Sequence, residues 1–289
     1  MNSLDVIIIE FTKIEGAGND FVLIDNRENK YSFSLPTLAR ILCNRHFGIG
    51  SDGLIVLESS TVADIKMRFL NPDGSEGAMC GNGGRCVAHY AILNRTKSKV
   101  SIEALDFVYN AETEDNNIKL QMKNPTELKF DIKISLQNEI ITGDFINTGS
   151  EHLVVDTEKL PVSLGNRLEE IDIKTIGRFL RYHKYFHPRG TNVNFIEKVG
   201  EREINIRTYE RGVEDETLAC GTGSVGSAII AAIKYSWKPP IKVHTRSGSI
   251  LTINFQYDSK NISDVTITGT AKITFTGKVK YSLIKNEIV

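Results

Sequence analysis

Two short stretches with the same pattern hold the residues best suited to chemistry. Cys80-Gly81-Asn82-Gly83 recurs as Cys220-Gly221-Thr222-Gly223, and each copy has a glutamate four residues before the cysteine, Glu76 and Glu216. Each copy opens an apolar run with helical spacing and follows a strand-like segment that contains an arginine. A pattern that recurs in this way at long range predicts a duplicated half-domain.

A thiol at the start of a helix lies beside unpaired backbone N–H groups and a partial positive charge, which lower its pKa and attract a carboxylate. Two halves related by a pseudo-twofold axis would bring two such helix starts face to face. One substrate carbon would then have a thiol on each side. This arrangement suits inversion of a stereocentre next to a carboxylate, which requires one group to remove a proton and another to deliver one to the opposite face.

Such a reaction requires no electron-sink cofactor in principle, and no lysine stands in a setting that suggests a pyridoxal Schiff base. We therefore expect no cofactor. A formal net charge of −1 offers no field for nucleic acid or for an anionic membrane, so we expect a small-molecule partner. We also expect no metal, because Cys80, Cys86 and His89 lack the paired spacing of a zinc site.

The chain has 289 residues, of which 40% are apolar and 25% charged, and this suits two globular lobes. No apolar run is long enough to cross a bilayer, and the N-terminus lacks the pattern of a signal peptide. Four cysteines are too few for a disulfide scaffold. We therefore expect a cytoplasmic protein with reduced thiols, in which Cys43 and Cys86 are core residues.

The elements that must position the two cysteines are short strands and a few helices. Strands are expected at 11–25 (two, joined by the turn 15–20), 54–58, 65–70, 99–104, 107–111, 118–122, 139–147, 153–155, 204–208, 242–245, 249–255, 265–270, 271–275 and 278–284. A further strand is entered through 190–192 and ends at 195–196. Helices are expected at 35–43, 84–93, within 162–182 and at 225–235. The polar, proline-containing segment 123–126 divides the chain into lobes 1–122 and 123–276, and 277–289 returns to the first lobe.

Several longer motifs match a known family. They are Gly18-Asn19-Asp20-Phe21, 48–53, 71–76 leading to Cys80, Gly190-Thr191-Asn192, and Tyr209-Glu210-Arg211-Gly212 leading to 216–223. With these motifs, nearly the whole chain resembles the diaminopimelate epimerases, pyridoxal-independent enzymes that interconvert LL- and meso-diaminopimelate in lysine and peptidoglycan biosynthesis. The resemblance implies an α+β fold with two pseudo-symmetric lobes, each a curved, mostly antiparallel β-sheet around a central helix, and a homodimer.

The resemblance also implies roles for individual residues. Cys80 and Cys220 are the acid/base pair, in which Cys220 accepts the proton of the LL substrate and Cys80 donates one. Arg211 suits the distal carboxylate of the substrate and Glu210 suits an ammonium group. The substrate ligands implied are the side chains of Asn19, Asn71, Asn192, Glu210 and Arg211 and the backbone amides of Gly81, Asn82, Gly221 and Thr222.

The chain departs from the family pattern in two places. Many members have Gly-Asn-Pro-His where this chain has Gly149-Ser150-Glu151-His152, so Ser150 replaces an asparagine ligand and His152 is expected to support the site. The loop 213–215 is one residue longer than the short form, which we expect to change the loop without moving Cys220. Glu216 is expected to support the site, and it can act as a dipole partner at the helix start.

Two other functions remain open from the residues. A proline or hydroxyproline racemase uses the same two-thiol logic, although Glu210 and Arg211 favour a substrate with a second amino-acid head group. A thiol redox or metal-binding module belongs to a different class and predicts a stable Cys80–Cys220 disulfide or a bound zinc ion.

Overall fold

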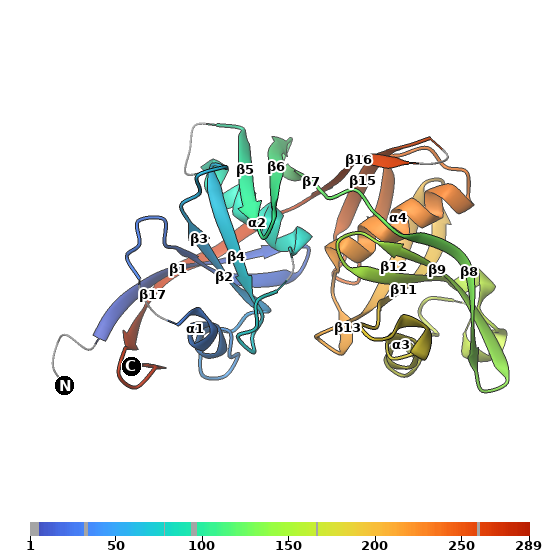
Figure 1. Ribbon diagram of the computed structural model, residues 1–289, viewed down its shortest axis with the longest axis horizontal. Coiled ribbons are helices and arrows are strands. Elements are labelled where there is room, and N and C mark those ends of the chain that lie inside the picture. Colours follow the sequence, from blue (N-terminus) through green and yellow to red (C-terminus); the bar gives the residue numbers. More distant parts are fainter. Residues whose placement is uncertain (1–5, 32–33, 78, 94–96, 166, 259–260) are drawn as a thin grey trace. The chain divides into compact units, whose positions relative to one another are not determined.

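The structure, a computed structural model, describes residues 6–31, 34–77, 79–93, 97–165, 167–258 and 261–289. It divides into two units: the first ends at Leu120 and resumes at Thr270, and the second runs from Gln121 to Gly269 (Figure 1). Among the described residues, no helix has the length and apolar character needed to cross a membrane.

The first unit is a sheet with a helix on each of its faces. Its elements are β1 (Val6–Gly16), β2 (Asn19–Asp25), α1 (Leu35–Leu42), β3 (Gly53–Glu58), β4 (Ile65–Leu70), α2 (Gly81–Leu93), β5 (Lys99–Ala104), β6 (Phe107–Glu114), β7 (Asn117–Gln121), β17 (Lys272–Ser282) and β18 (Glu287–Ile288). The strands pair in the order β17-β1-β2-β3-β4-β5-β6-β7, with β18 on β17. In this order the steps β2–β3 and β4–β5 are parallel and the others antiparallel.

The second unit repeats this order. Its elements are β8 (Leu128–Leu136), β9 (Glu139–Asn147), β10 (Glu151–Asp156), η1 (Thr157–Lys159), η2 (Val162–Leu164), α3 (Ile173–Arg181), η3 (Lys184–Phe186), β11 (Asn192–Gly200), β12 (Glu203–Glu210), β13 (Asp215–Thr217), α4 (Gly221–Lys234), β14 (Ile241–His244), β15 (Ile250–Tyr257) and β16 (Ile262–Gly269). The strands pair as β8-β9-β10-β11-β12-β14-β15-β16, and β10–β11 and β12–β14 are the parallel steps.

The duplication predicted from the two cysteine motifs is therefore confirmed strand by strand. The register extends the match to single residues. The first pair of the β2–β3 ladder is Phe21 with Gly53, and the first pair of the β10–β11 ladder is His152 with Asn192, so Phe21 corresponds to His152 and Gly53 to Asn192. In each unit the central helix packs against most of the sheet. It follows the corresponding strand of each unit, since α2 comes after β4, and α4 comes after β12 and the short β13. The fold is α+β with two similar, sheet-dominated units, as predicted.

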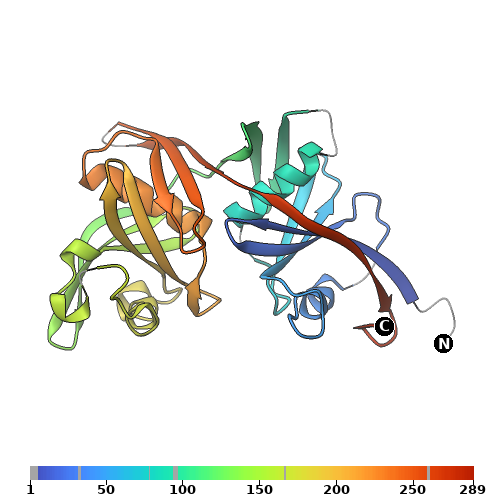
Figure 2. The same cartoon turned by 180° about the vertical axis from the view of Figure 1, so that it is seen from behind.

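The C-terminal segment differs from the expectation. The sequence predicts that residues 271–275 complete the second lobe, but residues 272–275 belong to β17, which pairs with β1 along its length (Figures 1 and 2). Gly277 falls between the two strands expected at 271–275 and 278–284. It lies instead opposite Phe11 within one strand, and a Cβ there would come within 2.6 Å of the Phe11 ring. The aromatic ring fills the space that the glycine leaves.

Two other differences have local causes. β8 was missed because it buries only Ile132 and Ile134 and exposes much of the rest of the strand. Helices α2 and α4 begin at Gly81 and Gly221, earlier than the expected 84 and 225. Their first turns are rich in glycine, which has a low helix propensity and hid the start of each helix.

The strands at the centre of each unit are covered on both faces. In β3, Leu54 and Val56 belong to a core cluster with α1, whereas the intervening Ile55 contacts the position of Gly83 in α2. In β11, Val193 and Phe195 belong to a cluster with α3, whereas Asn194 faces Gly223 in α4. This alternation holds the start of each central helix against the middle of its sheet.

Polar contacts fix α4 at its C-terminal end. Lys234 in the last turn donates to both carboxylate oxygens of Asp144, at 2.8 and 2.6 Å, and the Tyr235 hydroxyl donates to Asp156 at 2.6 Å. The helix is thereby held to β9 and β10 at the end opposite Cys220.

Candidate active site

Cys80 is positioned by the first turn of α2. Its carbonyl oxygen accepts the N–H of Gly84 at 2.7 Å, and its sulfur lies 3.4 Å from the N–H of Gly83. The first N–H groups of a helix have no acceptor within the helix. The sulfur is therefore placed where it accepts one of them and experiences the positive end of the helix dipole.

Asn19 brings a polar group from β2 to this thiol. Its Oδ1 lies 3.6 Å from Cys80 Sγ and 3.5 Å from Asn82 Nδ2, and its own Nδ2 donates to Asp52 Oδ2 at 2.7 Å. A carboxylate accepts only, so Asp52 fixes the orientation of the Asn19 amide and directs its oxygen toward Cys80. Arg45 holds Asp52 and Asp20 in turn.

The turn before Cys80 carries Asn71 and Glu76. Asn71 Nδ2 donates to the Ser75 hydroxyl at 2.9 Å, so its side chain takes part in the turn. Glu76 forms a β-bridge with Leu70 and accepts from Arg68 Nε at 3.1 Å. This ion pair ties the segment that leads to Cys80 back to β4.

Cys220 occupies the same place in the second unit, at the N-cap of α4. Its carbonyl oxygen accepts both the N–H and the hydroxyl of Ser224 at 2.9 Å, and its sulfur lies 3.6 Å from Thr222 Oγ1. The side chain is buried, with 8% of the residue exposed. The half-sites thus share the placement of the thiol, although Cys80 is the more exposed of the two.

A buried polar cluster adjoins Cys220. His152 Nε2 lies 2.9 Å from the Ser150 hydroxyl and 3.0 Å from the Thr222 hydroxyl, which are themselves 3.2 Å apart. On the other side of the ring, His152 Nδ1 accepts from Asn194 Nδ2 at 3.1 Å. Asn194 Nδ2 also donates to the carbonyl oxygen of Leu153, which fixes the amide orientation.

This network assigns the protonation of His152. Since Nδ1 is an acceptor, the ring proton of the neutral imidazole lies on Nε2 and points to the two hydroxyls. Burial, assisted by the positive charge of Arg211, lowers the pKa of His152 to about 3. His152 is therefore a neutral hydrogen-bond donor to the hydroxyl of Thr222, which lies close to Cys220.

A second cluster in the same unit joins Asn192 to Arg211. Asn192 Nδ2 donates to the carbonyl oxygen of Glu151 at 2.8 Å, and its Oδ1 accepts the backbone N–H of Arg211 at 2.9 Å. The Glu151 carboxylate accepts from Arg211 Nη1 at 2.7 Å and from Arg189 Nη1 at 3.2 Å. Burial raises the pKa of Glu151, but its own backbone N–H and the two guanidiniums outweigh burial and lower it overall.

Glu210 and Glu216 lie on the segments that lead to Cys220. Glu210 accepts from the Thr217 hydroxyl at 2.7 Å. Glu216 forms a bidentate ion pair with Arg207, with both distances 2.7 Å. Arg207 and Arg68 occupy equivalent places in the two units. Each lies two residues before the strand residue that pairs with the glutamate: Tyr209 pairs with Glu216, and Leu70 forms a bridge with Glu76. Glu216 therefore holds the approach to its cysteine as Glu76 does in the first unit.

Comparisons with known proteins identify the family of this chain. The family model for diaminopimelate epimerase matches residues 11–128 and 145–274. The diaminopimelate epimerase of Aquifex aeolicus is 39% identical over 96% of this chain and 100% of its own length, and that of Flavobacterium psychrophilum is 37% identical over 91% and 97%. This chain belongs to the diaminopimelate epimerase family.

Solved structures share the fold of this epimerase family member at low sequence identity. A hydroxyproline epimerase from Agrobacterium vitis with bound trans-4-hydroxy-L-proline has a TM-score of 0.72 and 17% identity, covering 97% of this chain and 94% of that chain. A phenazine biosynthesis protein of the PhzF family from Bacillus anthracis has a TM-score of 0.69 and 16% identity, covering 94% and 99%. These likenesses concern the fold alone.

Within the epimerase family pattern, the two departures of this chain have structural roles. Glu151, in place of a proline, pairs with Arg211, and Ser150, in place of an asparagine, joins the cluster of His152 and Thr222. The extra residue before Glu216 belongs to a loop in which Glu214 accepts from Arg181 and from the N–H of Gly212. The motif glycine Gly223 is required by packing, since a Cβ there would lie 2.3 Å from Asn194 Oδ1.

Sequence reasoning missed three residues of these half-sites. Asp52 orients Asn19, Asn194 orients His152, and Arg85 lies buried in α2. Two of them carry a signal in retrospect: Asn194 is a lone amide between apolar residues of a buried strand, and Arg85 is a lone charge in a helix expected to be mostly buried. Cys43 and Cys86 are buried as predicted, and burial raises the pKa of both thiols, that of Cys43 to about 11.

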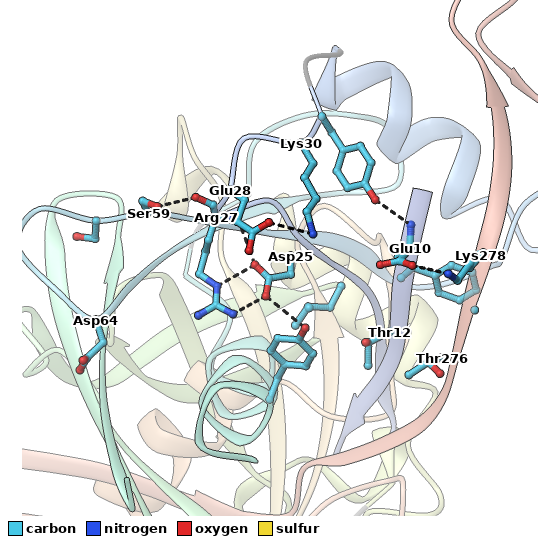
Figure 3. A pocket seen from close by; sticks show the side chains of 16 residues that line it. Glu10, Thr12, Asp25, Arg27, Glu28, Lys30, Ser59, Asp64, Thr276 and Lys278 are labelled. Carbon is cyan, nitrogen blue, oxygen red and sulfur yellow. Dashed lines mark hydrogen bonds and ion pairs between the residues drawn. The ribbon is translucent and has the colours of Figure 1, made fainter. Parts of the chain in front are cut away.

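A separate cavity of about 930 Å³ in the first unit offers a contrast (Figure 3). Its lining contains neither Cys80 nor Asn19. Three ion pairs account for most of the charged groups around it: Arg27 with Asp25, Lys30 with Glu28, and Lys278 with Glu10 (Figure 3). The cavity is therefore separate from the half-site at Cys80 and offers no thiol.

The neutral state of His152 predicts a pH dependence of stability. Below the ordinary pKa of 6.5 the unfolded protein binds a proton at this residue, whereas the folded protein does not until the pH approaches about 3. The stabilising contribution is thus complete above pH 6.5 and is lost as the pH falls. Between about pH 7.5 and about pH 5, the wild type should lose about 2 kcal/mol more of its free energy of unfolding than His152→Gln.

Urea denaturation at both pH values measures this difference. The matched control is His46→Gln, which makes the same replacement at a histidine on the surface and so separates the effect of burial at His152 from that of removing a histidine. An equal pH dependence in the wild type and in His152→Gln would show that the folded protein binds the proton too.

Proposed function

We propose that this protein is a cofactor-independent isomerase that interconverts LL- and meso-2,6-diaminopimelate, a step of lysine and peptidoglycan biosynthesis. Membership of the diaminopimelate epimerase family supports the substrate. The observation that carries the mechanism is the recurrence of a cysteine at the start of the central helix in both units, with matching strand order and register around it.

In the proposed mechanism the two half-sites act on one stereocentre from opposite faces. One cysteine, as the thiolate, removes the α-proton, and the other, as the thiol, delivers a proton to the opposite face. The protonation states of the two cysteines are exchanged after each turnover, which allows both directions. For the LL substrate we assign Cys220 as the acceptor and Cys80 as the donor.

The first-turn amides of both helices are the proposed cradle for the α-carboxylate. These are the backbone N–H groups of Gly81, Asn82, Gly221 and Thr222. They are fixed dipoles, so they stabilise the negative charge that develops next to the carboxylate without reorganising. Asn19 supports the Cys80 side, while Ser150 and the neutral His152 support the Cys220 side by holding Thr222.

The remaining proposed ligands recognise the distal part of a symmetric diacid. Arg211 binds the distal carboxylate and Glu210 an ammonium group, with the amides of Asn71 and Asn192 as further ligands. Glu151 accepts from Nη1 of Arg211, and the described residues make no hydrogen bond to Nη2 or Nε, so that edge is the proposed contact for the substrate. Asn192 supports this arrangement, since it bonds to the backbone of both Glu151 and Arg211.

Exchange of the substrate α-proton in heavy water tests the substrate assignment. Diaminopimelate should exchange its α-proton and epimerise, whereas proline and hydroxyproline should remain unlabelled, because neither has the distal head group that Arg211 and Glu210 are proposed to bind. Exchange of proline alone would identify a proline racemase. A stable Cys80–Cys220 disulfide in the active preparation, or tightly bound zinc with no exchange of any amino acid, would indicate the redox or metal-binding alternative.

Single-cysteine variants test the mechanism. Cys80→Ala and Cys220→Ala should each lower epimerisation by about 10²- to 10⁴-fold, the usual value of one acid/base group. Each variant should still exchange the α-proton of the isomer that faces its remaining thiol. We expect exchange of the LL isomer in Cys80→Ala and of the meso isomer in Cys220→Ala, measured by mass spectrometry. Full epimerisation by either variant would disprove the two-thiol mechanism.

We further propose that the enzyme is a cytoplasmic homodimer. Reduced catalytic thiols support a reducing compartment. Exposed apolar side chains on the β1–β17 pair, Ile8 at 55% and Phe275 at 51%, support a subunit contact there. Sedimentation velocity should show a species of twice the mass of the chain, and a monomer at all concentrations would exclude the dimer.

A further inference from the structure

Arg85 is a buried charge for which the described residues supply no ion-pair partner. It lies in α2, five residues after Cys80, and none of its surface is exposed. Nη1 donates to the carbonyl oxygen of Gly81 at 3.3 Å and Nη2 to Asn82 Oδ1 at 2.9 Å. Nε is buried and makes no hydrogen bond within the described part of the chain. No carboxylate of the described residues forms a salt bridge with it.

A guanidinium buried in this way is costly unless an anion compensates its charge. Burial lowers the pKa of Arg85, and three acidic groups oppose that shift, in the order Cys86, Cys80 and Glu15. Cys86 is fully buried, and because burial raises its pKa strongly it stays a neutral thiol. Glu15 lies on β1, where its carboxylate accepts the N–H of Gly18 at 3.0 Å. Cys80, the other of these groups, stands immediately before the helix that carries Arg85.

The contacts of Arg85 place its guanidinium in the turn that follows Cys80, since Arg85 Nη2 donates to Asn82 Oδ1. Asn19 Oδ1 accepts from Asn82 Nδ2 at 3.5 Å and from the Cys80 thiol at 3.6 Å. Asn19 therefore bonds to the thiol form of Cys80, and the charge of Arg85 acts on the thiolate through space. The other charges nearby are those of Asp52 and Asp20, which Arg45 neutralises, with Lys13 on Asp20. Among the described residues of this turn, the positive charge without an ion-pair partner is therefore that of Arg85.

The second half-site is an internal comparison. Counting from the cysteines, Val225 takes the place of Arg85 and Thr222 that of Asn82. The buried polar groups beside Cys220 stand instead on strands, as the neutral His152 and Asn194, at the positions that Phe21 and Ile55 occupy in the first unit. One half-site thus holds a buried cation and the other a buried neutral imidazole.

We propose that Arg85 is a positioning residue whose charge stabilises the thiolate of Cys80, so that Cys80 ionises before Cys220 in the free enzyme. The resting enzyme then has the Cys80 thiolate and the Cys220 thiol. In this state Cys80 takes the proton of the meso substrate and Cys220 donates its own. The LL substrate requires the opposite state, which must form by loss of a proton from Cys220 and gain of one by Cys80. This inference rests on the proposed two-thiol mechanism.

The pH dependence of alkylation by iodoacetamide tests the proposal. The rate for Cys80 is measured in Cys220→Ala and that for Cys220 in Cys80→Ala, with peptide mass spectrometry to assign the modified residue. The pH midpoint of a cysteine is the pH at which its alkylation rate is half of the maximum. We expect a lower midpoint for Cys80 than for Cys220. Arg85→Met should raise the midpoint of Cys80 by about 1 pH unit or more, because one opposite charge shifts a neighbouring group by that amount. Arg85→Lys should restore part of the difference.

Two controls separate this role from a structural one. The midpoint of Cys220 should stay the same in Arg85→Met, and Glu15→Gln should not reproduce the effect of Arg85→Met on Cys80. Thermal unfolding checks that each variant is folded, and Arg85→Gln replaces the methionine variant if the latter does not fold. An unchanged Cys80 midpoint in a folded, uncharged variant overturns the proposal, and so does a shift of equal size at Cys220.

Alkylation requires no substrate, so the result is independent of the proposed function. A protein that shows the expected midpoints but does not epimerise diaminopimelate would refute the function and leave the role of Arg85 intact. A protein that epimerises normally while Arg85→Met leaves the Cys80 midpoint unmoved would refute only the role of Arg85.

Discussion

The unpaired N–H groups at the start of an α-helix are the constraint on which this structure depends. They must find acceptors outside the helix, and both units place a cysteine at this point. In the proposed mechanism its sulfur and a substrate carboxylate supply these acceptors. In the first unit the sulfur of Cys80 already lies within reach of the N–H of Gly83. The rest of each unit holds that helix start in place. The ion pairs Arg68–Glu76 and Arg207–Glu216 fix the segments that lead to the two cysteines, and the sheet packs against the helix.

Duplication gave each half of the site the same frame but not the same electrostatics. Strand order, parallel steps and register correspond, so that Asn194 stands where Ile55 does and His152 where Phe21 does. Each half-site buries a different polar group beside its thiol, a guanidinium in one and a neutral imidazole in the other. An epimerase with two equal thiols would have no preferred resting state, and this difference supplies one.

Close packing explains several residues that ligand binding alone does not. Gly223 allows α4 to approach Asn194, and Gly277 allows the Phe11 ring to cover β17. Glu151, which replaces a proline of the family pattern, pairs with Arg211 and accepts Arg189 as well. The place of each of these residues is explained by the side chain that it accommodates or holds.

The sequence by itself determined the duplication, the family, the cysteines and the buried apolar face of each central helix, because these depend on residue type and local spacing. It did not reveal that residues 272–275 pair with β1, since strand pairing depends on which distant strand leaves an edge open. Nor did it reveal the partners of Arg85, Glu151 and His152. Their charge or proton position is set by burial and by groups distant in sequence, which only the tertiary structure brings together.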